Sequence, residues 1–163
     1  MPSAKTRQLS EIALLAAFIA VSGAFKLPSF LPGSEFQLSA PIAVAVCGVF
    51  GPKKYLLAGL LASAAGLLLG TQTFFNVLIA LLFRAAVALL YLLWGQSKWF
   101  YLLAGPLAST AARAALGLLV GKAVYPLILA AIPGMIFTAL TAGLFAAALS
   151  KTLRLGNRLS QRS

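Results

Sequence analysis

The stretch NVLIALLFRAAVALLYLLW, from Asn76 to Trp94, decides the fold class of this chain. After its first residue it is apolar throughout, except for Arg84 close to its centre. A helix needs about 20 apolar residues to cross the hydrocarbon core of a bilayer, so this stretch predicts a membrane-spanning helix. A charged side chain near the middle of such a helix costs roughly 3 kcal/mol on insertion scales. We therefore expect Arg84 to face a polar environment and not lipid.

The composition of the whole chain agrees with this prediction. Of its 163 residues, 61% are hydrophobic and only 9% are charged. A water-soluble domain of this size has too much surface for its volume to hide so many apolar side chains. We therefore expect an integral, multi-pass protein of a bacterial or archaeal cell membrane.

Turns and charges divide the chain into six apolar segments. They cover about residues 9–25, 36–50, 55–70, 74–94, 99–120 and 124–149. The fourth, fifth and sixth are long enough to cross a bilayer, whereas the second and third are short. The sequence predicts one all-α membrane domain over residues 1–163, a bundle of six transmembrane helices.

The basic residues predict the orientation of this bundle, because cytoplasmic loops of membrane proteins accumulate Lys and Arg. With both termini in the cytoplasm, nine basic residues lie on the inner side: Lys5, Arg7, Lys53, Lys54, Lys98, Lys151, Arg154, Arg158 and Arg162. Lys26 and Lys122 lie outside, and Arg84 and Arg113 lie within the membrane. The net charge of +11 is thus explained by topology, and we expect no nucleic-acid partner.

The inventory of reactive side chains argues against an enzyme. The chain has no histidine, no aspartate and only two glutamates, Glu11 and Glu35. This excludes metal sites, carboxylate pairs and Ser-His-Asp catalysis, so we expect no cofactor and no metal. The stretch GLLVGKA (Gly117–Ala123) lacks the spacing of a phosphate-binding loop, so ATP-driven transport would need another subunit. The single cysteine, Cys47, lies in an apolar run and is predicted to be a packing residue.

Polar residues gather in the half of the bundle that is predicted to face outside. They are Glu35, Gln37, Gln72, Asn76, Arg84, Arg113 and Tyr125. We expect them to line one cavity that binds a small molecule. Two arginines without an acid inside the membrane suggest a ligand with a carboxylate or phosphate, because the planar guanidinium pairs with such groups through two hydrogen bonds. Arg84 could alternatively meet Glu35.

A purely structural role is the alternative for each of these residues. Glu35 and the arginines would then pair with each other or extend to the membrane surface. Gln72 and Asn76 would cap helices.

Small residues in the first segment provide surfaces that another helix can approach closely. They are Ala13, Ala16, Ala17 and Ala20. The helix that approaches them belongs either to the bundle itself or to a partner subunit.

An internal similarity links the third and fifth segments. AGLLASAA (Ala58–Ala65) and AGPLASTA (Ala104–Ala111) lie near their beginnings. The match reflects either a parallel duplication or a shared content of small residues.

Taken together, these residues resemble the substrate-binding S-component of energy-coupling factor (ECF) transporters. The resemblance covers nearly the whole chain, with six short hydrophobic helices, ALLAAFIA (Ala13–Ala20) and a proline-containing outer loop. The strongest match is EFQLSAPIAVAVCGVFGPKKYLLAGLLAS (Glu35–Ser63), where a polar start of the second helix leads to a G-P-K turn.

The resemblance implies a membrane scaffold subunit and two cytoplasmic ATPases, which reorient the S-component to release its ligand inside. It implies that an A-x-x-x-A motif in the first helix docks the scaffold; Ala13 and Ala17 have this spacing, as do Ala16 and Ala20. It further implies that a vitamin-like micronutrient binds in the outer half, under the first outer loop and between the fourth, fifth and sixth helices.

Two other classes of protein have similar features. A structural membrane protein of the rod-shape-determining type also has about six short helices, and predicts an empty interior. A solitary facilitator would bind the same ligand but would work without ATPases.

Overall fold

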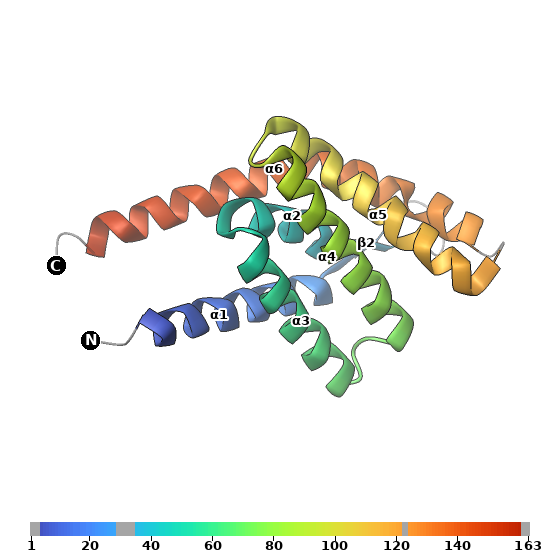
Figure 1. Cartoon of the computed structure of the whole chain (residues 1–163), viewed down its shortest axis with the longest axis horizontal. Coiled ribbons are helices and arrows are strands. Elements are labelled where there is room, and N and C mark those ends of the chain that lie inside the picture. The colour runs from blue at the N-terminus through green and yellow to red at the C-terminus, as the bar shows by residue number, and fades with distance from the viewer. Residues whose placement is uncertain (1–3, 29–34, 122–123, 161–163) are drawn as a thin grey trace.

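The computed structural model describes residues 4–28, 35–121 and 124–160. Within these ranges six helices form, as the sequence predicts: α1 (Ala4–Ala24), α2 (Ser39–Phe50), α3 (Pro52–Leu68), α4 (Phe74–Trp94), α5 (Lys98–Val120) and α6 (Val124–Ser160). They pack as one bundle (Figure 1), in which α4 lies between α3 and α5.

The six helices confirm a helical fold, but the connection between α1 and α2 is not the plain loop that the sequence predicts. Two short strands, β1 (Lys26–Pro28) and β2 (Glu35–Gln37), pair antiparallel, with Lys26 opposite Gln37. The sequence prediction placed residues 26–35 in a loop and started the second helix at residue 36. Residues 35–37 form β2 and pair with β1, so α2 begins only at Ser39.

Several helix ends differ from the apolar segments that predicted them. α1 begins at Ala4 and α6 continues to Ser160, because Lys, Arg and Leu are good helix formers beyond an apolar run. α3 begins at Pro52, the first helical position that proline favours, after Gly51 with a φ of 85°. In contrast, α4 has the predicted bounds: Thr73 caps its start and Gly95, with a φ of 59°, ends it.

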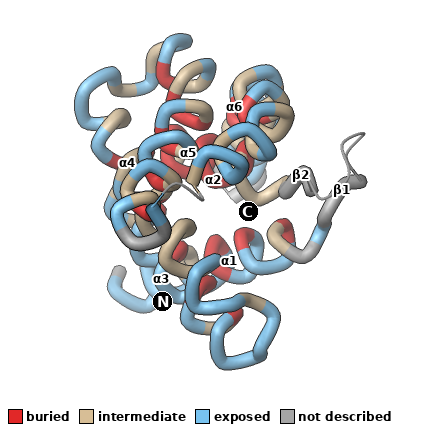
Figure 2. Tube along the Cα trace, turned by 90° about the vertical axis from the view of Figure 1, so that its right-hand side faces the viewer, coloured by how far each residue is buried: buried red, intermediate tan, exposed pale blue. Residues whose placement is uncertain are grey.

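The short helix α2 is the centre of the bundle and contacts all five other helices. Its residues from Pro41 to Gly48 are all buried, whereas the outer helices are buried along one side only (Figure 2). A helix that is apolar on every side requires neighbours on every side. Cys47 is fully buried here and forms no disulfide, so its predicted packing role is confirmed.

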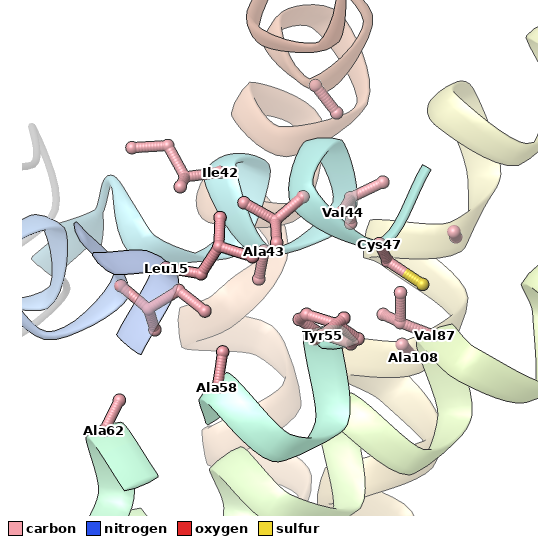
Figure 3. Close-up of a cluster of buried hydrophobic side chains, with 14 of the residues drawn as sticks. Leu15, Ile42, Ala43, Val44, Cys47, Tyr55, Ala58, Ala62, Val87 and Ala108 are labelled. Atoms are coloured by element: carbon pink, nitrogen blue, oxygen red, sulfur yellow. The ribbon is translucent and has the colours of Figure 1, made fainter. Parts of the chain in front are cut away.

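The largest fully buried side chain in the described core is Tyr55, at the start of α3. Its ring lies among Cys47 of α2 and Val87 of α4 (Figure 3). Among the described residues, its hydroxyl has no hydrogen-bond partner. Tyr55 therefore acts through the packing of its ring, which joins three helices.

The outside of the bundle is rich in large apolar side chains, such as Leu92 (72% exposed) and Leu118 (90% exposed). Within the described ranges, two helical stretches are long and apolar enough to cross a bilayer: α4 and the Val124–Gly156 part of α6. Exposed apolar surface of this extent is unfavourable in water and suits lipid. The predicted crossings of the other four helices and the orientation of the termini stay predictions.

Substitutions at Tyr55 test this packing role. We expect Tyr55→Ala to lower the free energy of unfolding by about 3–5 kcal/mol, since it empties a fully buried aromatic site. We expect Tyr55→Phe to leave stability unchanged or to raise it, because only an unpaired hydroxyl is lost. Thermal unfolding in detergent measures both, and a large loss in Tyr55→Phe would contradict the role given to the ring.

Candidate functional site

A cavity of about 230 Å³ lies between α1, α2, α4 and α5. Its apolar wall includes Ile19, Ala43 and Phe83. Its polar wall consists of Ser39, Asn76, Arg84, Ser109 and Arg113. Asn76, Arg84 and Arg113, which the sequence predicts to share one cavity, all line this one.

Arg84 is 7% exposed and extends from α4 towards α3. Its Nη1 donates a hydrogen bond to the hydroxyl of Ser63, at 2.5 Å. The side chain passes over Gly59, where a Cβ atom would collide with Cδ and Nε of Arg84. The arginine thus needs both the space at Gly59 and the hydroxyl at Ser63 to lie where it does.

Arg113, on α5, is held by the residue one turn earlier on the same helix. Its Nη1 donates to the carbonyl oxygen of Ser109, at 3.2 Å, and to the Ser109 hydroxyl. Both residues line the cavity. The two arginines therefore approach the cavity from two different helices, each with a serine at its guanidinium.

The cavity carries positive charge without a described carboxylate to balance it. None of the described residues that line it is acidic. A guanidinium has five N–H donors, and each serine hydroxyl accepts from only one nitrogen here. The remaining donors can bind a carboxylate or phosphate, and they do so more strongly in an apolar surrounding than in water.

Other candidates from the sequence lie elsewhere. Gln72 packs against Gly66 of α3 and does not line the cavity. Tyr125 is 67% exposed and is not among the residues that line this cavity. Glu35 and Gln37 belong to β2 by their backbone, but their side chains lie outside the described part of the structure.

The alternative prediction, that Gln72 and Asn76 cap helices, is wrong for α4. The N-cap is Thr73, whose hydroxyl accepts a hydrogen bond from the backbone N–H of Asn76, at 3.3 Å. Asn76 does not cap the helix but lines the cavity.

Glu11 is paired at a distance from the cavity. Its Oε2 lies 2.5 Å from Nζ of Lys54, and this ion pair joins α1 to the first turn of α3. Both side chains are about a third exposed, at 34% and 35%. Solvent-exposed pairs contribute little, about 0–1 kcal/mol, so this one links the two helices without dominating stability.

Three serines that contribute to the site were not singled out from the sequence: Ser39, Ser63 and Ser109. A serine within an apolar helix usually bonds to its own backbone and carries no distinctive pattern. The one signal that could have found two of them is the repeated A-G-x-L-A-S pattern, which contains Ser63 and Ser109.

The alanines of α1 divide between two faces. Ala16 is buried against the core, next to Leu15 and Ile19. Ala13, Ala17 and Ala20 are exposed and form one stripe along the outside of the helix. The Ala13/Ala17 pair is thus available to another helix, whereas Ala16 is occupied by the bundle.

Comparison with known proteins gives one informative relative. The chain is 48% identical to Protein BioX of Lysinibacillus sphaericus over 136 residues, which cover 83% of this chain and 82% of the relative. No family model matches the chain. No solved structure matches it either.

The water access of the cavity can be tested with engineered cysteines, because the native Cys47 is fully buried. We expect an Ala80→Cys variant, in the cavity wall, to react with a charged thiol reagent in membrane vesicles, since the thiolate forms only where water enters. A Leu89→Cys variant is the matched control: Leu89 is 59% exposed on the same helix but does not line the cavity. Equal labelling of both variants would show that exposure alone, and not the cavity, controls access.

Proposed function

This chain belongs to the family of Protein BioX, and on that premise we propose that it is the substrate-binding membrane subunit of an ECF-type transporter. It captures a small, vitamin-like anion from outside the cell, and partner subunits drive its uptake with ATP. The observation that carries the proposal is a cavity inside an apolar bundle that is lined by two arginines and by no described acid.

The chemistry of the cavity supports an anionic ligand. Burying the guanidinium of Arg84 away from water is costly, and intramembrane charges usually mark a functional site. Arginine pairs with a planar carboxylate or a phosphate through two parallel hydrogen bonds, which gives orientation as well as affinity. The apolar wall formed by residues such as Ile79 and Phe83 would contact the rest of the ligand.

The membrane placement rests on the exposed apolar surface and on the charge distribution. The start of α1 and the end of α6 lie on the same side of the bundle (Figure 1). That arrangement suits an even number of crossings with both termini on one side. The excess of Lys and Arg near these ends supports an orientation with that side in the cytoplasm.

The proposed partners are a membrane scaffold subunit and two cytoplasmic ATPases. The stripe of Ala13, Ala17 and Ala20 on the outside of α1 supports a docking face, since small residues let a second helix approach closely. The chain has no nucleotide-binding motif of its own, so uphill transport requires such subunits.

The structural alternative of the rod-shape-determining type is less well supported, because it predicts an interior without a charged cavity. A solitary facilitator would have the same cavity. It differs in its partners, so co-purification of ATPases from native membranes separates it from the ECF-type subunit.

Mass spectrometry of the purified protein tests the function directly. We expect a small molecule with a carboxylate or phosphate to remain bound after gentle detergent purification. We expect Arg84→Ala and Arg113→Ala each to reduce the retained amount, with a loss in affinity of roughly 10- to 100-fold for a hydrogen-bonded charged group. Tyr125→Ala is the control, since this exposed residue lies outside the cavity and should leave binding intact. If both arginine variants retained as much bound small molecule as the unmodified protein, the proposed anion site would be wrong.

Bulky substitutions on α1 test the docking face. We expect Ala17→Trp to abolish co-purification of the ATPases while ligand retention stays normal, because the exposed stripe is blocked and the cavity is not. Leu14→Trp is the matched control, as Leu14 is 71% exposed on the same helix outside the stripe. If both variants kept their ATPases, the stripe would not be the docking face.

A further inference from the structure

The repeated pattern A-G-x-L-A-S occurs at Ala58–Ser63 of α3 and at Ala104–Ser109 of α5. Corresponding residues of the two copies have similar surroundings. The first alanine of each copy is fully buried, and the second is buried in both, at 5% for Ala62 and 0% for Ala108. The helices that carry the copies pack on α4, the helix of Arg84.

In the first copy, the glycine and the serine both contact Arg84. Gly59 and Ser63 are one helical turn apart, so they lie on the same face of α3. The arginine stem crosses this face at Gly59, and its Nη1 reaches the Ser63 hydroxyl at 2.5 Å. Ser63 is 1% exposed and does not line the cavity, so it acts on the cavity only through Arg84.

In the second copy, the serine again holds an arginine of the cavity. Ser109 accepts a hydrogen bond from Nη1 of Arg113, through its hydroxyl. The glycine again permits a close approach, but to a different neighbour: a Cβ at Gly105 would collide with Cγ2 of Thr138, on α6. The two copies thus share a serine that binds a cavity arginine and a glycine against which a side chain packs tightly.

We propose that the repeated A-G-x-L-A-S motif is the element that positions the arginines of the cavity, with Ser63 and Ser109 as positioning residues for Arg84 and Arg113. The proposal deepens the function proposed above and rests on it for the role of the arginines. A long arginine side chain loses much rotamer freedom when it binds a ligand. A serine that holds one nitrogen in advance lowers this cost and leaves the other donors for the anion.

The first test needs no ligand. The chain contains only six arginines, so an NMR spectrum of ¹⁵Nε-labelled arginine side chains in lipid nanodiscs is simple to assign with single Arg→Lys variants. We expect Ser63→Ala to change the signal of Arg84 and not that of Arg113, and Ser109→Ala to do the reverse. We expect Ser109→Thr, which keeps a hydroxyl, to retain the Arg113 signal.

Ser22→Ala is the matched control. Ser22 is also a buried serine of the bundle, but its hydroxyl bonds to the carbonyl of Ile19, at 2.9 Å. Its loss should leave both arginine signals unchanged. If the signals of Arg84 and Arg113 were equally unchanged in Ser63→Ala and Ser109→Ala, the serines would not position them and the proposal would be overturned.

Titration with inorganic phosphate and with acetate then separates this proposal from the function on which it rests. We expect both anions to shift the Arg84 and Arg113 signals of the unmodified protein, and Ser63→Ala to weaken the response of Arg84 by roughly threefold to tenfold. In Arg84→Lys, anion binding is followed through the Arg113 signal, since Arg113 lines the same cavity. The further loss of Ser63 should not weaken this binding any more, because the serine acts through the Arg84 guanidinium. Absence of any response in the unmodified protein would refute the anion site, while the serine-dependent signals would still support the positioning role. Additive losses in the double variant would overturn that role.

Discussion

The burial of the Arg84 charge is the constraint on which the arrangement of this bundle depends. An isolated cation in an apolar interior costs several kcal/mol even after relaxation, so it persists only where polar groups surround it. The bundle meets this requirement from two sides. On the α3 side, the Ser63 hydroxyl accepts a hydrogen bond from Arg84, and Gly59 leaves space for the arginine stem. On the other side, Arg84 lines the cavity. Arg84 therefore adds a polar contact between α3 and α4 to the apolar packing of Tyr55 and Val87.

The central helix α2 explains why a cavity exists beside that charge. In lipid, helices gain little from hiding apolar surface and associate mainly through close packing, which favours small residues. Residues 41–48 of α2 fill the middle of the bundle completely. The start of α2, at Ser39 and Ala40, and the buried residue Ala43 form one wall of the cavity. The strand pair, which the sequence did not predict, ends two residues before the cavity-lining residue Ser39.

The fold was largely predictable, because apolar runs and turn residues locate helices in such a chain. α4 was predicted with its observed bounds since Thr73 and Gly95 are strong cap residues. The ends of α1 and α6 were not, because hydropathy marks where lipid contact ends and a helix of Lys, Arg and Leu continues beyond that point. The strand pair was hidden because Pro28, at the end of β1, and Pro32, between the two strands in the sequence, are typical of a loop.

The site was predictable only in its charged part. An arginine or asparagine in an apolar run stands out, and Asn76, Arg84 and Arg113 indeed share one cavity. Gln72 and Tyr125 were expected there because they lie at helix ends on the same predicted side, but the direction of a side chain at a helix end depends on tertiary packing. Ser63 is inconspicuous in the sequence, since its partner Arg84 lies on another helix.

The structure also indicates why serine, and not an acid, holds each arginine. A carboxylate at Ser63 or Ser109 would orient the guanidinium equally well, but it would neutralise the charge that the proposed anionic ligand needs. A hydroxyl accepts the hydrogen bond and leaves the positive charge in place, so the cavity is oriented in advance without being neutralised.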